Sequence, residues 1–187
     1  DSSFKKSVAD IAGGAIFVTG NNVNITGSSF EDCSVSMDKV ITGKDYTTGG
    51  GAIYILGNDT HIMNCTFDDA HGKEGGAVYV DGRNAVIDNA TTSNSYALNG
   101  GAFYINGVNA TISNSNISSS SVTQKGGAIY INGVNASVIN STFNNTSATS
   151  GTYGSDNLGG AIYIKGNYAN IIGSEFEYII DKSYGLS

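Results

Sequence analysis

Hydrophobic and polar residues alternate along this chain in short runs, and one run returns six times. Its pattern is Gly-Gly-Ala, then Ile, Val or Phe, then Tyr or Phe, then Ile or Val. A period of two within each run predicts β-strands rather than helices. The six copies occupy residues 13–18, 50–55, 75–80, 100–105, 126–131 and 159–164.

The spacing of these runs predicts the architecture. Each unit continues with a glycine, a second alternating run around Ile or Val, and a third run around a large residue, most often Phe. Three short strands and three turns in one repeat are typical of one coil of a right-handed parallel β-helix, with coils stacked ~4.8 Å apart. We expect an all-β solenoid of about six coils, forming one domain over 1–187 that is excised from a longer protein. The second glycine of each run lies at 14, 51, 76, 101, 127 and 160, a basic repeat of about 25 residues.

Alternation also predicts which side chains point inward. Ile53 and Ile55 lie on one face of their strand and Tyr54 on the other. We place the β-branched pair inside, because stacked Ile and Val suit a narrow core, with the columns of Ile62 and Phe67 on the other two sides. An asparagine ladder is expected at one turn, where Asn tolerates a left-handed backbone and its amide can bond its neighbour. Its members are Asn64, Asn89, Asn114 and Asn140.

Two repeats are longer than the others, which indicates insertions at 31–49 and 144–158. Both follow the third run and precede the next Gly-Gly, so we expect them to project from the same edge. Insertions on one face of a solenoid often form its binding surface. Neutral growth of a loop is the alternative interpretation.

Composition and charge narrow the classes of partner. The formal net charge is −7 and Arg83 is the only arginine, which argues against nucleic acid or an anionic membrane. No apolar stretch is long enough to span a bilayer. Cys33 and Cys65 occupy different columns of the repeat, so two small buried residues are expected, with a disulfide or a metal site as alternatives. No metal and no cofactor are predicted.

Several motifs carry a resemblance to known surface proteins. Phe67-Asp68-Asp69-Ala70 before 75–80, and Phe143-Asn144-Asn145-Thr146 before 159–164, resemble the polymorphic-membrane-protein repeat of bacterial surface proteins and autotransporters. The longer string 126–146 is similar to the adhesin-like proteins of methanogenic archaea. Thr92 and Ile117 depart from the pattern, since they replace Phe. The resemblance implies cell-surface adhesion or display, in an extracellular location.

An aromatic column is the first candidate binding site. If Ile faces inward, the rings stand outside in a row, where they could stack on sugars or contact a protein partner. Stacking between coils that rigidifies the rod, or burial under another segment, is the structural alternative. Tyr46 and Tyr153, in the two insertions, are further candidates. The column contains Phe17, Tyr54, Tyr79, Tyr104, Tyr130 and Tyr163.

A polysaccharide-active enzyme, similar to pectate lyases or galacturonases, is a second hypothesis, because such enzymes use the parallel β-helix fold. Asp68, Asp69 and His71 are the nearest thing to a catalytic constellation. Adjacent strand residues point to opposite faces, however, so solvated turn residues are the simpler interpretation, and no catalytic residue is assigned.

Asparagines in Asn-x-Ser/Thr sequons are candidates for glycosylation, and Asn116, Asn144 and Asn145 are the best placed of them. The function expected is therefore a non-catalytic, adhesin-like stalk or binding rod that presents a shallow surface to glycans or to a cell-surface protein. The third alternative is a structural spacer or filament subunit that associates end to end through exposed strand edges.

Overall fold

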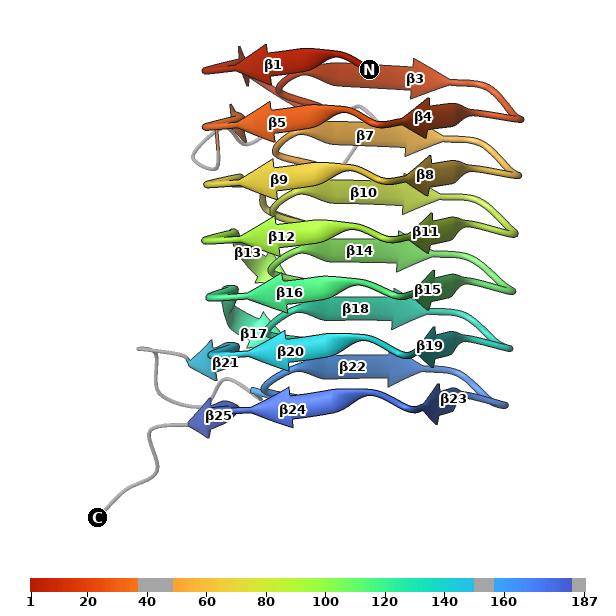
Figure 1. The fold of residues 1–187 in the computed structure, drawn as a ribbon, viewed down its shortest axis with the longest axis vertical. Coiled ribbons are helices and arrows are strands. Elements are labelled where there is room, and N and C mark those ends of the chain that lie inside the picture. Colours follow the sequence, from red (N-terminus) through yellow and green to blue (C-terminus); the bar gives the residue numbers. More distant parts are fainter. Residues whose placement is uncertain (37–48, 150–156, 183–187) are drawn as a thin grey trace.

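A computed structural model describes residues 1–36, 49–149 and 157–182 of the chain. Within these residues the fold contains strands and no helix, and the strands pair in parallel throughout. Figure 1 shows the strands stacked in columns, one coil above the next. The molecule is a parallel β-helix, as the repeat predicts. In the described part of the chain, no helix is long and apolar enough to cross a membrane.

The Gly-Gly-Ala runs form the first sheet, and their β-branched residues point into the core. Ile53 and Ile55 are fully buried in the main hydrophobic cluster, whereas Tyr54 belongs to a separate cluster. The predicted orientation is therefore confirmed. The strands of this sheet are β3 (Ile16–Thr19), β7 (Ile53–Leu56), β10 (Val78–Asp81), β14 (Phe103–Asn106), β18 (Ile129–Asn132) and β22 (Ile162–Lys165).

The second sheet follows after a turn and buries the Ile62 column. Its strands are β4 (Asn24–Thr26), β8 (His61–Met63), β11 (Val86–Asp88), β15 (Thr111–Ser113), β19 (Ser137–Ile139) and β23 (Asn170–Ile172).

The third sheet has one strand more than the repeats predict, because residues 3–5 add a strand before the first Gly-Gly. Phe4 stacks on Phe30 with ring centroids 5.0 Å apart, and so begins the phenylalanine column. The strands are β1 (Ser3–Lys5), β5 (Ser29–Glu31), β9 (Thr66–Asp68), β12 (Thr91–Ser93), β16 (Asn116–Ser118), β20 (Thr142–Asn144) and β24 (Glu175–Glu177).

A fourth column of short strands corrects the prediction of three strands per coil. The polar stretch after each phenylalanine position is itself paired, and its inward residues are small, such as Ala97, Val122 and Ala148. Alternation built on such small side chains is too weak to recognise in the sequence. The strands are β2 (Val8–Ala9), β6 (Ser34–Val35), β13 (Tyr96–Asn99), β17 (Ser121–Lys125), β21 (Ser147–Thr149) and β25 (Ile180–Lys182).

These short strands also make the two insertions shorter than the sequence predicts. Strand β6 lies inside the range 31–49 and β21 inside 144–158, so both ranges begin with regular coil. The remaining extra residues, 37–48 and 150–156, lie outside the described residues.

The predicted asparagine ladder has the expected backbone but fewer amide contacts. All four members have φ between 47° and 56°. Asn89 Nδ2 donates to Asn64 Oδ1 at 2.8 Å, but Asn114 Nδ2 donates instead to Asp88 Oδ1 at 2.7 Å. Asp88 competes because its carboxylate accepts a charge-assisted hydrogen bond, which is stronger than an amide acceptor offers.

A more regular ladder occurs at the turn between the first and second sheets. Asn84, Asn109 and Asn135 each donate from Nδ2 to the Oδ1 of the preceding member, at 2.8, 2.9 and 3.1 Å, and the first acceptor is Asp59. All four have φ of 58–59°. This ladder was missed because asparagine is also frequent at neighbouring positions. It fixes the turn by the same mechanism that was assigned to the predicted one.

Core packing compensates for one small residue in the phenylalanine column. Thr92 is fully buried beside Phe67, and its Oγ1 has no hydrogen-bond partner among the described residues. Phe103, which stands in a column of Ile and Val, packs edge-on against Phe67 with centroids 6.3 Å apart. A large ring in the first sheet, Phe103, thus occurs where the third sheet has a small side chain, Thr92.

Both cysteines are free and buried, in agreement with the simpler interpretation of the sequence. Burial raises the pKa of both Cys33 and Cys65.

Candidate functional site

The aromatic column forms a continuous stack, which we call the tyrosine row (Phe17, Tyr54, Tyr79, Tyr104, Tyr130 and Tyr163). Each ring stacks on the ring of the next coil, and the successive centroid distances are 5.4, 4.4, 5.2, 4.5 and 5.1 Å. The row lies on the face of the first sheet that points away from the main core. The parallel register of the coils therefore produces the predicted alignment of the rings.

Burial corrects the expectation that the whole row faces solvent. Tyr54 and Tyr79 expose only 1% and 6% of their surface, whereas Phe17 exposes 46%. Ala12, Ile11 and Leu56 pack in the cluster around the two buried rings. Tyr54 and Tyr79 are therefore not accessible to a ligand in this structure, whereas Tyr104, Tyr130 and Tyr163 are partly exposed.

Stacking also argues against the hypothesis that sugars stack on the rings of this row. A sugar stacks on the face of an aromatic ring, but inside the row each ring face already lies against the ring of a neighbouring coil. What Tyr104 and Tyr130 present outward is therefore the ring edge. The Nζ of Lys125 lies 5.4 Å from the centroid of the Tyr163 ring. Tyr46 and Tyr153 lie outside the described residues.

A polar column runs beside the tyrosine row. Asn99 Nδ2 donates to Glu74 Oε1 at 3.3 Å and to Gln124 Oε1 at 3.1 Å. Burial raises the pKa of Glu74 to about 7, although the hydrogen bond from Asn99 and the charge of Lys73 oppose this rise. Burial, and then the charge of Glu74, raise the pKa of Tyr104. Glu74 was missed from the sequence because nothing in its local pattern indicates burial.

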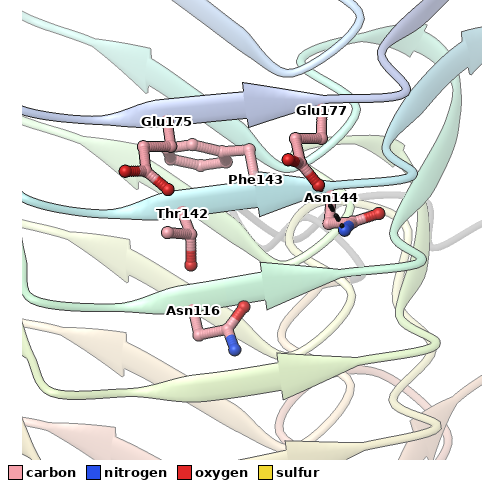
Figure 2. Close-up of a pocket in the computed structure, with 6 residues that line it drawn as sticks. All are labelled: Asn116, Thr142, Phe143, Asn144, Glu175 and Glu177. Atoms are coloured by element: carbon pink, nitrogen blue, oxygen red, sulfur yellow. Dashed lines mark hydrogen bonds between the residues drawn. The ribbon is translucent and has the colours of Figure 1, made fainter.

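A shallow hollow of about 250 Å³ lies on the outer face of the third sheet, across β16, β20 and β24. Figure 2 shows its amide, hydroxyl and carboxylate groups standing on these neighbouring strands. Asn144 Nδ2 donates to Glu177 Oε2 at 3.2 Å across two of them. We call this site the polar hollow; it is lined by Asn116, Thr142, Phe143, Asn144, Glu175 and Glu177.

The sequence analysis named two of these residues, but for another role. Asn116 and Asn144 were candidates for glycosylation, and both line the polar hollow. Asn145 lies just outside it, with φ of 52°, and donates to Ser119 Oγ at 3.4 Å. Glu175 and Glu177 were missed. Their positions on either side of Phe176 already indicate that both point outward, since the phenylalanine column points in.

The three residues of the enzyme hypothesis do not form one cluster, because Asp68 bonds with other partners than Asp69 and His71 do. Asp68 accepts hydrogen bonds from Ser93 Oγ at 2.6 Å and Asn94 Nδ2 at 2.9 Å. Asp69 bonds instead with His71 Nε2 at 2.9 Å. In the described ranges, no group of three His, Cys, Asp or Glu side chains is arranged to hold a metal ion.

Comparisons of the chain with protein-family models, curated proteins and solved structures give no match.

Proposed function

We propose that this chain is a non-catalytic, adhesin-like β-helical rod of the cell surface that binds glycans through the polar hollow. The observation that supports this most is the composition of the hollow, where amide, hydroxyl and carboxylate groups from three coils face one shallow surface. Such planar polar groups suit the hydroxyl groups of sugars. The resemblance to surface-protein repeats supports the extracellular location.

The charge of the site favours neutral or amine-bearing sugars. Glu175 and Glu177 place two negative charges at the hollow, in a chain whose formal net charge is −7. Polyanionic glycans would be repelled by this field, at least at low ionic strength.

Thr142 offers a direct test, because Thr91 is its matched control in the same outward column of the third sheet. We expect the 187-residue chain to bind a subset of neutral glycans on an array. Thr142→Ala and Asn144→Ala should each weaken that binding by about tenfold, since a site built to hydrogen-bond a hydroxyl loses roughly 1–2 kcal/mol with one partner. Thr91→Ala should bind like the parent.

Two other results would change this assignment. If Tyr130→Phe weakens binding while Thr142→Ala does not, the edge of the tyrosine row is the binding surface. If bound oligosaccharides are recovered cleaved, and Glu175→Gln or Glu177→Gln stops the cleavage, the chain is an enzyme. Both carboxylates stand on exposed residues, whereas the acid of a glycosidase lies in an enclosed environment.

End-to-end association into a filament is the second candidate function, and strand β24 favours it. Phe176 is 44% exposed, and Glu175 and Glu177 flank it. A second copy stacked with its β1 on β24 would place its Phe4 on Phe176 and its Lys5 opposite Glu177. The pair has a precedent within the chain, where Lys5 Nζ lies 2.6 Å from Glu31 Oε2.

Coil geometry limits this contact. The chain begins in the third sheet, with β1, and reaches the first sheet only at β3. If β1 of the second copy pairs with β24 of the first copy, the first sheet therefore lacks one strand between β22 of the first copy and β3 of the second. Only the third and fourth sheets would continue, so we expect weak association.

A charge exchange tests the filament. In sedimentation at low salt, the average mass of the parent should rise with concentration, while Glu177→Lys and Lys5→Glu should each remain monomeric. An equal mixture of the two variants should associate again, since their charges are complementary. A parent that stays monomeric at every concentration, or variants that associate as it does, would exclude this stacking.

A further inference from the structure

Glu74 is held in an unusual state for a carboxyl side chain. Its Oε1 accepts one long hydrogen bond, from Asn99 Nδ2 at 3.3 Å. Its Oε2 is buried and has no hydrogen-bond partner in the described part of the chain. Leaving a buried carboxyl oxygen unpaired is costly, and the cost is far greater for the ionised form than for the neutral acid.

Glu74 and Tyr79, a buried member of the tyrosine row, lie on either side of Gly49. A Cβ added at Gly49 would meet Glu74 Cβ at 3.2 Å and Tyr79 Cδ2 at 3.4 Å, so these two side chains flank the same glycine. The charge of Glu74 acts on the hydroxyl of Tyr104 and, more weakly, on that of Tyr130. Any movement of this carboxyl therefore changes the surroundings of the row.

Few charges surround Glu74 in the described ranges. Lys73 is adjacent in sequence but exposed, so its ammonium group remains in water. The charge of Glu74 also acts on the phenols of Tyr104 and Tyr130, and the Tyr79 ring lies across Gly49 from it. Asn99 and Gln124 complete the polar column and do not titrate. None of these neighbours supplies a buried cation for the carboxylate.

We propose that Glu74 is a proton-controlled latch on the tyrosine row. In the neutral form, its side chain stays packed between Gly49 and Asn99 and keeps Tyr79 covered. In the ionised form, it turns out to solvent beside Lys73 and opens the edge of the row at Tyr79 and Tyr104. This proposal is independent of glycan binding at the polar hollow.

The direction of the pH dependence follows from the pKa of Glu74, which burial raises from 4.5 to about 7. A group whose pKa is higher in the folded state stabilises the fold fully below its unfolded pKa, and this contribution is lost as the pH rises through the folded pKa. The latch should therefore be closed at pH 5 and open at pH 8.

Near-ultraviolet circular dichroism reads the latch directly, because the chain has 11 Tyr and no Trp. Between pH 4 and pH 9, we expect the tyrosine signal of the parent to change with a midpoint near 7, and its melting temperature to fall over the same range. In Glu74→Gln, which cannot ionise, both should stay level. Glu175→Gln, on the outer face of the third sheet, is the matched control and should behave like the parent.

Carbon-13 spectroscopy of the glutamate carboxyls in the parent provides a measurement that does not depend on a variant. The Glu74 resonance should titrate near pH 7. The latch is excluded if Glu74 titrates near 4.5, if the tyrosine signal does not follow its titration, or if the pH-dependent change persists in Glu74→Gln.

Discussion

Gly107→Ala is expected to destabilise the fold by about 3 kcal/mol or more, whereas Gly20→Ala should leave its stability unchanged or slightly raised. The two glycines occupy the same column, after the first strand of a coil. A Cβ at Gly107 would collide with the carbonyl group of Gly82 in the preceding coil, reaching its carbon at 2.6 Å. At Gly20 it would meet nothing within 4 Å.

Comparing the two variants separates the effect of the contact between coils from the effect of replacing glycine in this turn. The clash is with backbone that is itself hydrogen-bonded between coils, since Gly82 N donates to Asn106 O at 2.9 Å. No rotation of a side chain can relieve it. Urea unfolding followed by circular dichroism measures both variants against the parent. Equal effects at the two positions would show that the coils are not packed in this way.

The second large effect is expected in the core, where Phe103→Val should cost roughly 3 kcal/mol because it leaves a cavity beside Phe67 and Thr92. Thr92→Phe alone should cost about 2 kcal/mol, since the ring of Phe103 occupies the space it needs. The double variant restores the arrangement of other coils, with Phe in the third sheet and Val in the first. It should therefore cost at least about 1 kcal/mol less than the sum of the single variants.

A double-mutant cycle by urea unfolding measures this coupling. Phe143→Leu, in the same phenylalanine column but two coils away, combined with Thr92→Phe serves as the control and should be additive within about 0.5 kcal/mol. Strict additivity of Phe103→Val and Thr92→Phe would contradict the compensation between the two columns.

Large side chains made most of the fold predictable. The Ile53 and Phe67 columns indicate their strands because large apolar residues that alternate with polar ones are typical of β-strands with one buried face. The fourth sheet was not predictable, since its inward positions hold residues such as Ala97 and Ala148, whose small size gives no contrast with neighbouring Ser and Thr. The strand at Phe4 was missed because it precedes any Gly-Gly.

The candidate sites show a similar division. Alternation correctly placed Tyr104 outside the main core, and the expected spacing of the coils already made stacking of the rings one of the alternatives. The burial of Tyr54 and Tyr79 was not predictable, because the residues that pack around them come from other positions of the chain. The polar hollow depends on side chains from three coils, so no single repeat carries its signature. Burial of Glu74 likewise arises only when its neighbours in space are known.

The hydrogen bonds of the ladder that begins at Asp59 all run in one direction along the rod. Every amide in it donates toward the preceding coil, and the first acceptor is a carboxylate that has no hydrogen to pass on. A parallel series begins at Asp81 and continues through Asn106 and Asn132. A duplicated middle coil would thus find a donor on one side and an acceptor on the other. A coil duplicated after the two aspartates would therefore extend both ladders. A coil duplicated before them could not join the ladders, because Asp59 and Asp81 have no side-chain amide to donate to it.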